Sequence, residues 1–259
     1  MKAKLEIQRI NERIVDFTEV GETNRVDAYL VLGDERALLV DSLTVEVGLA
    51  EAIRGLTDLP VTVAITHGHG DHAGAEVRNL IAAGCDVYMA PVDVDLLTRV
   101  FGAPEECRAW YKPLAEGDVF DLGGIRLETI AVPGHTPGSV VFYEPEKKWL
   151  FSGDTVGSGA FWMQIPGCAP LHVFADSLDR LIGRVGAGED LLIYPGHRYQ
   201  SPAQLTGPYL EDARFITRGI LAGEIRGRED TYRLGGRELH CRVAAHGLMR
   251  AYSFDPENL

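Results

Sequence analysis

Three histidines and an aspartate lie within six consecutive residues, directly after an apolar run. The run spans 61–65, and the cluster comprises His67, His69, Asp71 and His72. A short run rich in valine and isoleucine is typical of a buried strand. Ligands of open α/β sheets bind beyond the carboxyl ends of the strands, which is where these side chains fall. Because imidazole and carboxylate groups are ligands of zinc and iron, the cluster predicts a metal site.

Three further segments repeat this arrangement of a strand, a glycine- or proline-rich turn and one side chain that can bind a metal. His135 lies in the turn 133–139, Asp154 follows a strand ending near 151, and His197 follows the apolar run 191–194. Taken singly, each is more typical of an ordinary turn residue. Together with the first cluster they supply five histidines and two aspartates, enough for two ions.

The order of these motifs resembles the metallo-β-lactamase-fold hydrolase superfamily. The chain carries His-x-His-x-Asp-His, then Pro-Gly-His-Thr-x-Gly, then Ser-Gly-Asp, then Pro-Gly-His, and the resemblance covers about residues 10 to 200. It implies two divalent metal ions, with zinc expected and iron or manganese as alternatives. The implied ligands of the first ion are His67, His69 and His135, those of the second are Asp71, His72 and His197, and Asp154 would bridge both ions.

The resemblance also implies an α/β fold, a four-layer αββα sandwich with the metals at one edge between the sheets. The patterning predicts helices at 45–57, 74–83, 92–101, 175–185 and 208–222, with strands between them and a small terminal sheet. We predict a hydrolase domain over 1–207. Residues 208–259 are expected to add a helix and a small sheet packed on the same domain.

Two ions a few ångströms apart can activate a water at neutral pH without a serine or cysteine nucleophile. Asp154 and Asp71 are the predicted catalytic residues: Asp154 fixes the separation of the ions, and Asp71 orients the hydroxide or passes a proton to the leaving group. Asp41 is a candidate partner for a ligating imidazole. A turn or helix-capping role before residue 45 explains Asp41 equally well.

Composition favours an enzyme of small molecules in the cytoplasm. The net charge of −13 disfavours nucleic-acid and anionic-membrane partners. No apolar run of 18 residues occurs, the N-terminal residues lack an apolar signal segment, and the four cysteines form no Cys-x-x-Cys pair. The oligomeric state is not predicted by any of these features.

We predict cleavage of a small ester, thioester or lactone. Asp154 stands where familiar zinc β-lactamases carry cysteine, which disfavours a β-lactam, and His69 argues against the diiron oxygen-reducing branch. Aromatic residues at 161–162 and 110–111 are candidate walls of an acyl pocket, with core packing as the alternative. His172 is a candidate substrate contact, with an ordinary solvated loop residue as the alternative. A metal-binding sensor or redox-partner module, and a phosphodiesterase, remain alternatives.

Overall fold

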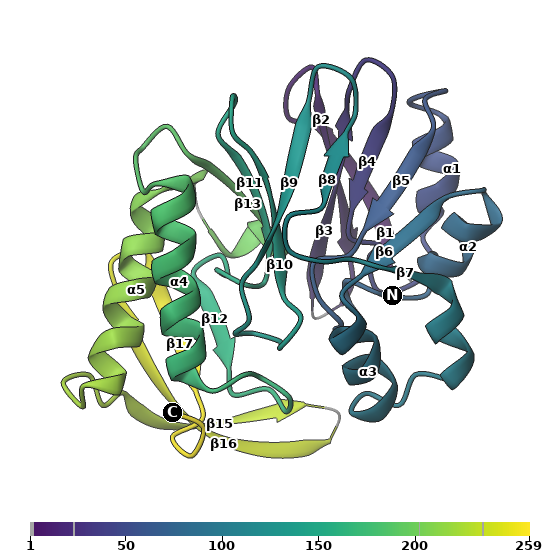
Figure 1. Ribbon diagram of the computed structural model, residues 1–259. Coiled ribbons are helices and arrows are strands. Elements are labelled where there is room, and N and C mark those ends of the chain that lie inside the picture. Colours follow the sequence, from purple (N-terminus) through teal and green to yellow (C-terminus); the bar gives the residue numbers. More distant parts are fainter. Residues whose placement is uncertain (1–2, 23, 202, 235) are drawn as a thin grey trace.

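The computed structural model describes residues 3–22, 24–201, 203–234 and 236–259. Two large sheets pack face to face, and helices cover the outer face of each (Figure 1). The predicted αββα sandwich is therefore confirmed. Within the described ranges, no helix is both long and apolar enough to cross a membrane.

The first sheet is built from the N-terminal part of the chain, and its strands follow one another in sequence order. They are β1 (Lys4–Arg9), β2 (Ile14–Val20), β3 (Arg25–Leu32), β4 (Ala37–Val40), β5 (Val61–Ala64), β6 (Asp86–Met89) and β7 (Tyr111–Pro113). The strands from β4 to β7 run parallel. The helices of this half are α1 (Leu49–Arg54), α2 (Glu76–Ala82), α3 (Pro91–Arg99) and the short 3-10 helix η1 (Glu105–Trp110).

The second sheet has the order β14-β13-β11-β10-β9-β8. Its strands are β8 (Val119–Asp121), β9 (Arg126–Ala131), β10 (Val140–Glu144), β11 (Trp149–Gly153), β13 (Leu192–Pro195) and β14 (Leu205–Thr206). The helices on its outer side are α4 (Leu171–Val185) and α5 (Pro208–Leu221) (Figure 1). The 3-10 helix η2 (Arg198–Gln200) follows β13, which runs parallel to β11.

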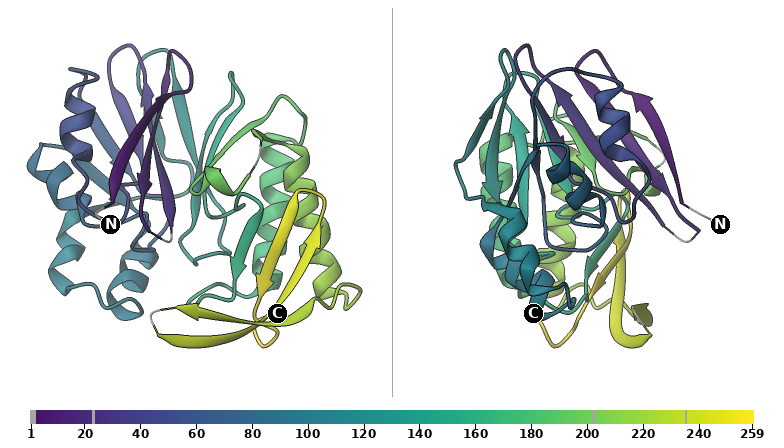
Figure 2. Two further views of the ribbon diagram at one scale, coloured as in Figure 1. Left: turned by 180° about the vertical axis from the view of Figure 1, so that it is seen from behind. Right: turned by 90° about the vertical axis from the view of Figure 1, so that its right-hand side faces the viewer.

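A third, smaller sheet joins the end of the chain to an earlier segment. Its order is β12-β17-β16-β15, from β12 (Ala160–Met163), β15 (Arg228–Leu234), β16 (Arg237–His246) and β17 (Met249–Phe254). The terminal sheet was predicted, but its pairing with β12 was not. The β15–β16 hairpin crosses the lower end of the sandwich (Figure 2). The proposed domain boundary at residue 207 stays a prediction.

Alternating side chains divide the core into layers, because successive residues of a strand face opposite sides of a sheet. In β4, Leu38 and Val40 lie between the two sheets, whereas Leu39 packs beneath α1 and α2. In β10, Phe142 faces the layer between the sheets and Val141 faces the α4 side. Each sheet thus has one face in the shared core and one face packed against helices.

Two predicted helices have different starts in the structure. Helix 45–57 begins only at Leu49, because Gly48 has φ +82° and the amides of residues 47–49 donate to the buried carboxylate of Glu76. Helix 175–185 begins four residues earlier, at Leu171, directly after Pro170. The strands β3 and β4 form an antiparallel hairpin, with Tyr29 opposite Val40.

Candidate metal centre

The seven predicted ligands come from four loops at one edge of the sandwich. The first four follow β5, His135 lies between β9 and β10, and Asp154 and His197 follow β11 and β13 directly. Because β5, β11 and β13 end at this edge, the sequence-distant motifs meet there. The side chains form three groups whose ligand atoms lie within 4.8 Å of one another. These are His67, His69 and His135; His67, His72 and Asp154; and Asp71, His72 and His197.

Asp154 connects the histidine groups. One of its oxygens lies 3.4 Å from Nε2 of His72, and the other lies 3.7 Å from Nε2 of His135 and 3.2 Å from Nε2 of His197. Asp71 is more open, with a side chain 27% exposed, and lies 3.5 Å from Nε2 of His197. Asp154 thus occupies the position expected of a shared ligand, and Asp71 faces the cleft.

In three of the five histidines, the second ring nitrogen is held by an acceptor from outside the cluster. Nδ1 of His135 lies 2.8 Å from the carbonyl oxygen of Trp162, and Nδ1 of His197 lies 2.6 Å from that of Arg25. Nδ1 of His72 lies 2.8 Å from Oδ2 of Asp41. Such contacts fix the tautomer and orientation of ligating imidazoles. Asp41 is confirmed as a partner of an imidazole, whereas α1 is capped by Gly48.

Two observations fit a metal ion at this point. Nε2 of His67 and of His72 are buried and make no hydrogen bond to the described residues, a situation that is rare unless an ion is bound there. The backbone also leaves no spare room: a Cβ at Gly196 would lie 2.3 Å from Cε1 of His72 and 2.7 Å from Oδ1 of Asp154. Glycine in the Pro-Gly-His motif therefore lets the His197 loop reach the other ligands.

The electrostatics divide the imidazoles into two kinds. Burial lowers the pKa of His67 and His135, and lowers the pKa of His69 to about 3, so all three are neutral and offer a lone pair. Burial opposes protonation of His72 and His197, yet the charge of Asp154 raises the pKa of both well above the usual value. The three neutral imidazoles offer lone pairs, and the carboxylates beside His72 and His197 supply negative charge. Both features favour the binding of cations.

Asp93 is a structural partner of the centre that the sequence did not reveal. This buried α3 residue accepts hydrogen bonds from the amide of Gly68, the hydroxyl of Thr136 and the amide of Gly138, at 2.7, 2.6 and 2.7 Å. It therefore joins the loop of His67 and His69 to the loop of His135. An aspartate in the first turn of a helix is common, so the local sequence gives no signal of this role.

The sequence profile of the metallo-beta-lactamase superfamily matches residues 21–197, which include every predicted ligand. The chain belongs to the metallo-beta-lactamase superfamily. Membership confirms the resemblance and the prediction of a metal-dependent hydrolase.

Among its superfamily relatives is acyl-coenzyme A thioesterase MBLAC2 of Gallus gallus, 29% identical over 70% of this chain and 74% of the relative. Hydroxyacylglutathione hydrolase of Xanthomonas axonopodis pv. citri is 34% identical over 66% of this chain and 59% of the relative. TTHA1623, solved in a di-iron-bound form, has a TM-score of 0.58 and 31% identity, over 75% of this chain and 95% of that one. A metallo-beta-lactamase from Pontibacter korlensis shares the fold, with a TM-score of 0.66, 21% identity and coverage of 83% and 99%.

This superfamily member has a cleft of about 620 Å³ above the seven predicted ligands, which we call the metal-binding cluster because they are the candidate ligands of an ion. Trp162 lines it, but Phe161 is fully buried in the core and Trp110 and Tyr111 pack beneath the first sheet. For these three residues the alternative of core packing holds. For His172 the solvated alternative holds: the residue is exposed, and its ring nitrogen lies 3.0 Å from the carbonyl oxygen of Leu259, outside the cleft.

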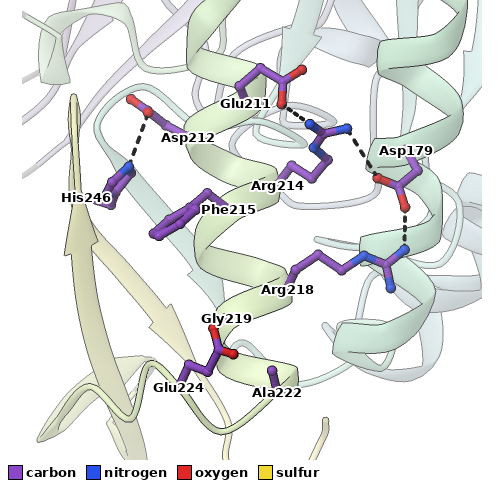
Figure 3. Close-up of a pocket in the computed structure, with 10 residues that line it drawn as sticks. All are labelled: Asp179, Glu211, Asp212, Arg214, Phe215, Arg218, Gly219, Ala222, Glu224 and His246. Carbon is purple, nitrogen blue, oxygen red and sulfur yellow. Dashed lines mark hydrogen bonds and ion pairs between the residues drawn. The ribbon is translucent and has the colours of Figure 1, made fainter.

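A second cavity, of about 660 Å³, lies between α4, α5 and β16 (Figure 3). Arg214 and Arg218 both pair with Asp179 there, and His246 pairs with Asp212 and stacks on Phe215 with ring centroids 4.2 Å apart. None of the predicted ligands lines it. We therefore assign the chemistry to the cleft above the metal-binding cluster.

Proposed function

We propose that the chain is a binuclear metal-dependent hydrolase that cleaves a small ester, thioester or lactone. The observation that carries this proposal is Asp154, whose two carboxylate oxygens lie within 3.7 Å of histidines from both predicted ligand sets. A sensor or redox-partner module does not require such a shared carboxylate. The thioesterase and hydroxyacylglutathione hydrolase relatives support the same choice of bond.

His67, His69 and His135 would hold one ion, Asp71, His72 and His197 would hold the other, and Asp154 would bridge them. Two such ions supply a nucleophilic water and polarise the scissile carbonyl. Zinc is the proposed metal because histidine dominates the ligands, with iron or manganese as alternatives. Because TTHA1623 was solved in a di-iron-bound form, iron remains an alternative to zinc for the proposed site.

The protein's own residues then orient the substrate and move protons. Asp71 borders the cleft, and Asn24 donates to its Oδ2 over 3.4 Å. Burial opposes ionisation of Asp71, but its neighbours His72 and His197 lower its pKa. Its carboxylate is therefore ionised, and it would hold an ion and accept a hydrogen bond that orients the attacking water.

The proposed substrate is a small neutral or weakly charged carbonyl compound, since the net charge of −13 disfavours polyanions. The cytoplasm is the proposed location, where free thiols such as those of Cys85, Cys107, Cys168 and Cys241 persist.

The substrate class is tested with matched carbonyl and phosphodiester compounds at defined metal content. We expect kcat/KM to be at least about tenfold higher for the best ester, thioester or lactone than for any phosphodiester, a difference of about 1.4 kcal/mol in activation free energy. A clear preference for the phosphodiester would replace the carbonyl assignment. If the fully metal-loaded protein hydrolyses no compound of the panel, the result would favour the metal-binding sensor.

A further inference from the structure

The cleft above the metal-binding cluster has one apolar side, and that side is made partly by the end of the chain. Its apolar lining residues come from three separate segments: Phe101, then Trp162 and Ile165, then Tyr232 and Leu234. The last two belong to β15, in the hairpin that crosses the lower end of the sandwich (Figure 2). The C-terminal hairpin therefore borders the predicted active site.

Trp162 and Tyr232 form the centre of this apolar side. Their rings meet edge to face, with centroids 4.9 Å apart and an angle of 63° between the planes. The two strands that carry them, β12 and β15, belong to the same four-stranded sheet. Because the carbonyl oxygen of Trp162 also accepts from Nδ1 of His135, this aromatic pair is fixed relative to a predicted ligand.

Polar residues also line the cleft. Asn24 contacts Asp71, and the hydroxyl of Tyr199 lies 3.4 Å from Oδ1 of Asn24. Thr44, Gln200 and Arg233 are further polar lining residues. A molecule with an apolar and a polar end thus meets both kinds of residue in this cleft. The hydroxyl of Tyr232 forms no hydrogen bond within the described part of the chain, so its ring is the part held by neighbours.

We propose that Trp162 and Tyr232 form a wall that binds an apolar acyl chain and thereby determines substrate specificity. The acyl chain lies along the two rings, and the polar leaving group lies toward Asn24 and Tyr199. This inference rests on the proposed hydrolase function and narrows its substrate to carbonyl compounds with a linear acyl chain of several carbons.

The test measures binding without turnover. Straight-chain carboxylates from acetate to octanoate are titrated into the metal-loaded protein by calorimetry. For the wild type we expect the affinity to rise by about fourfold for each methylene that the wall covers. Tyr232→Ala and Trp162→Ala should each weaken octanoate binding by about tenfold and leave acetate within about twofold.

Two variants separate the ring from other effects. Tyr232→Phe keeps the ring and should bind octanoate like the wild type, whereas Tyr232→Gln keeps a long side chain on the hairpin but removes the ring and should behave like Tyr232→Ala. Phe215→Ala removes an exposed aromatic residue of the α4–α5 cavity and serves as the matched control, with no expected change. Equal chain-length dependence in the wild type, Tyr232→Ala and Tyr232→Gln would overturn the wall.

Hydrolysis of matched acyl thioesters distinguishes failure of the proposed aromatic wall from failure of the proposed hydrolase function. If thioesters are hydrolysed with no dependence on chain length or on Tyr232, the hydrolase proposal holds and the wall is wrong. If no ester, thioester or lactone is hydrolysed but octanoate binding still depends on both rings, the wall stands and the reaction assignment is wrong.

Discussion

Replacing Asp154 with alanine should lower kcat/KM by at least about 100-fold, which corresponds to about 3 kcal/mol of transition-state stabilisation. The carboxylate lies between His72, His135 and His197, so its loss removes the only group shared by the proposed ligand sets. The residue follows the end of β11 and does not fill the apolar core. The fold should therefore persist, as judged by circular dichroism.

Asp190→Ala is the matched control for that experiment. Asp190 precedes β13 at the end opposite His197, and its exposed carboxylate pairs with Lys148 at 2.5 Å. We expect wild-type activity from this variant. Activity of Asp154→Ala within about threefold of the wild type, a barrier change below about 1 kcal/mol, would contradict the bridging role.

Asp93→Asn should destabilise the protein by about 3 kcal/mol and weaken binding of the first metal equivalent by about 10- to 100-fold. The carboxylate accepts three hydrogen bonds, and an asparagine of the same size turns an NH2 group toward at least one of those donors. The loops that carry His67, His69 and His135 then lose their common anchor.

Unfolding in urea and competition with a chelator measure the two effects. Asp95→Asn, two residues along α3, is the control: its half-exposed carboxylate pairs with Arg108, and such pairs contribute at most about 1 kcal/mol. If Asp93→Asn has the same stability and metal affinity as Asp95→Asn, the Asp93 carboxylate is not needed to anchor the two loops.

The motifs predicted the ligand cluster well because each is short and lies at the end of one strand. Four ligand-type residues follow β5 within six positions, so local sequence alone brings them together. The partner of His72 could also be predicted from the sequence, because Asp41 comes directly after β4, the parallel neighbour of β5. The convergence of these residues is therefore a consequence of strand order.

Other features depend on contacts that no local pattern contains. Asp93 lies 25 and 45 positions from the two glycines it binds. The acceptors for His135 and His197 are backbone carbonyl oxygens, which any residue provides. The Tyr232 ring reaches Trp162 only because β17 pairs with β12. Trp110 looked as suitable as Trp162 for an acyl pocket, but it packs beneath the first sheet.

The metal content of the purified protein tests the central claim most directly. After growth in metal-replete medium, or after reloading, elemental analysis should find up to two transition-metal ions per chain, and hydrolysis should depend on them. Asp154→Ala should retain fewer ions than Asp190→Ala prepared in parallel. A protein that holds no transition metal and cannot be reloaded would contradict the proposed centre.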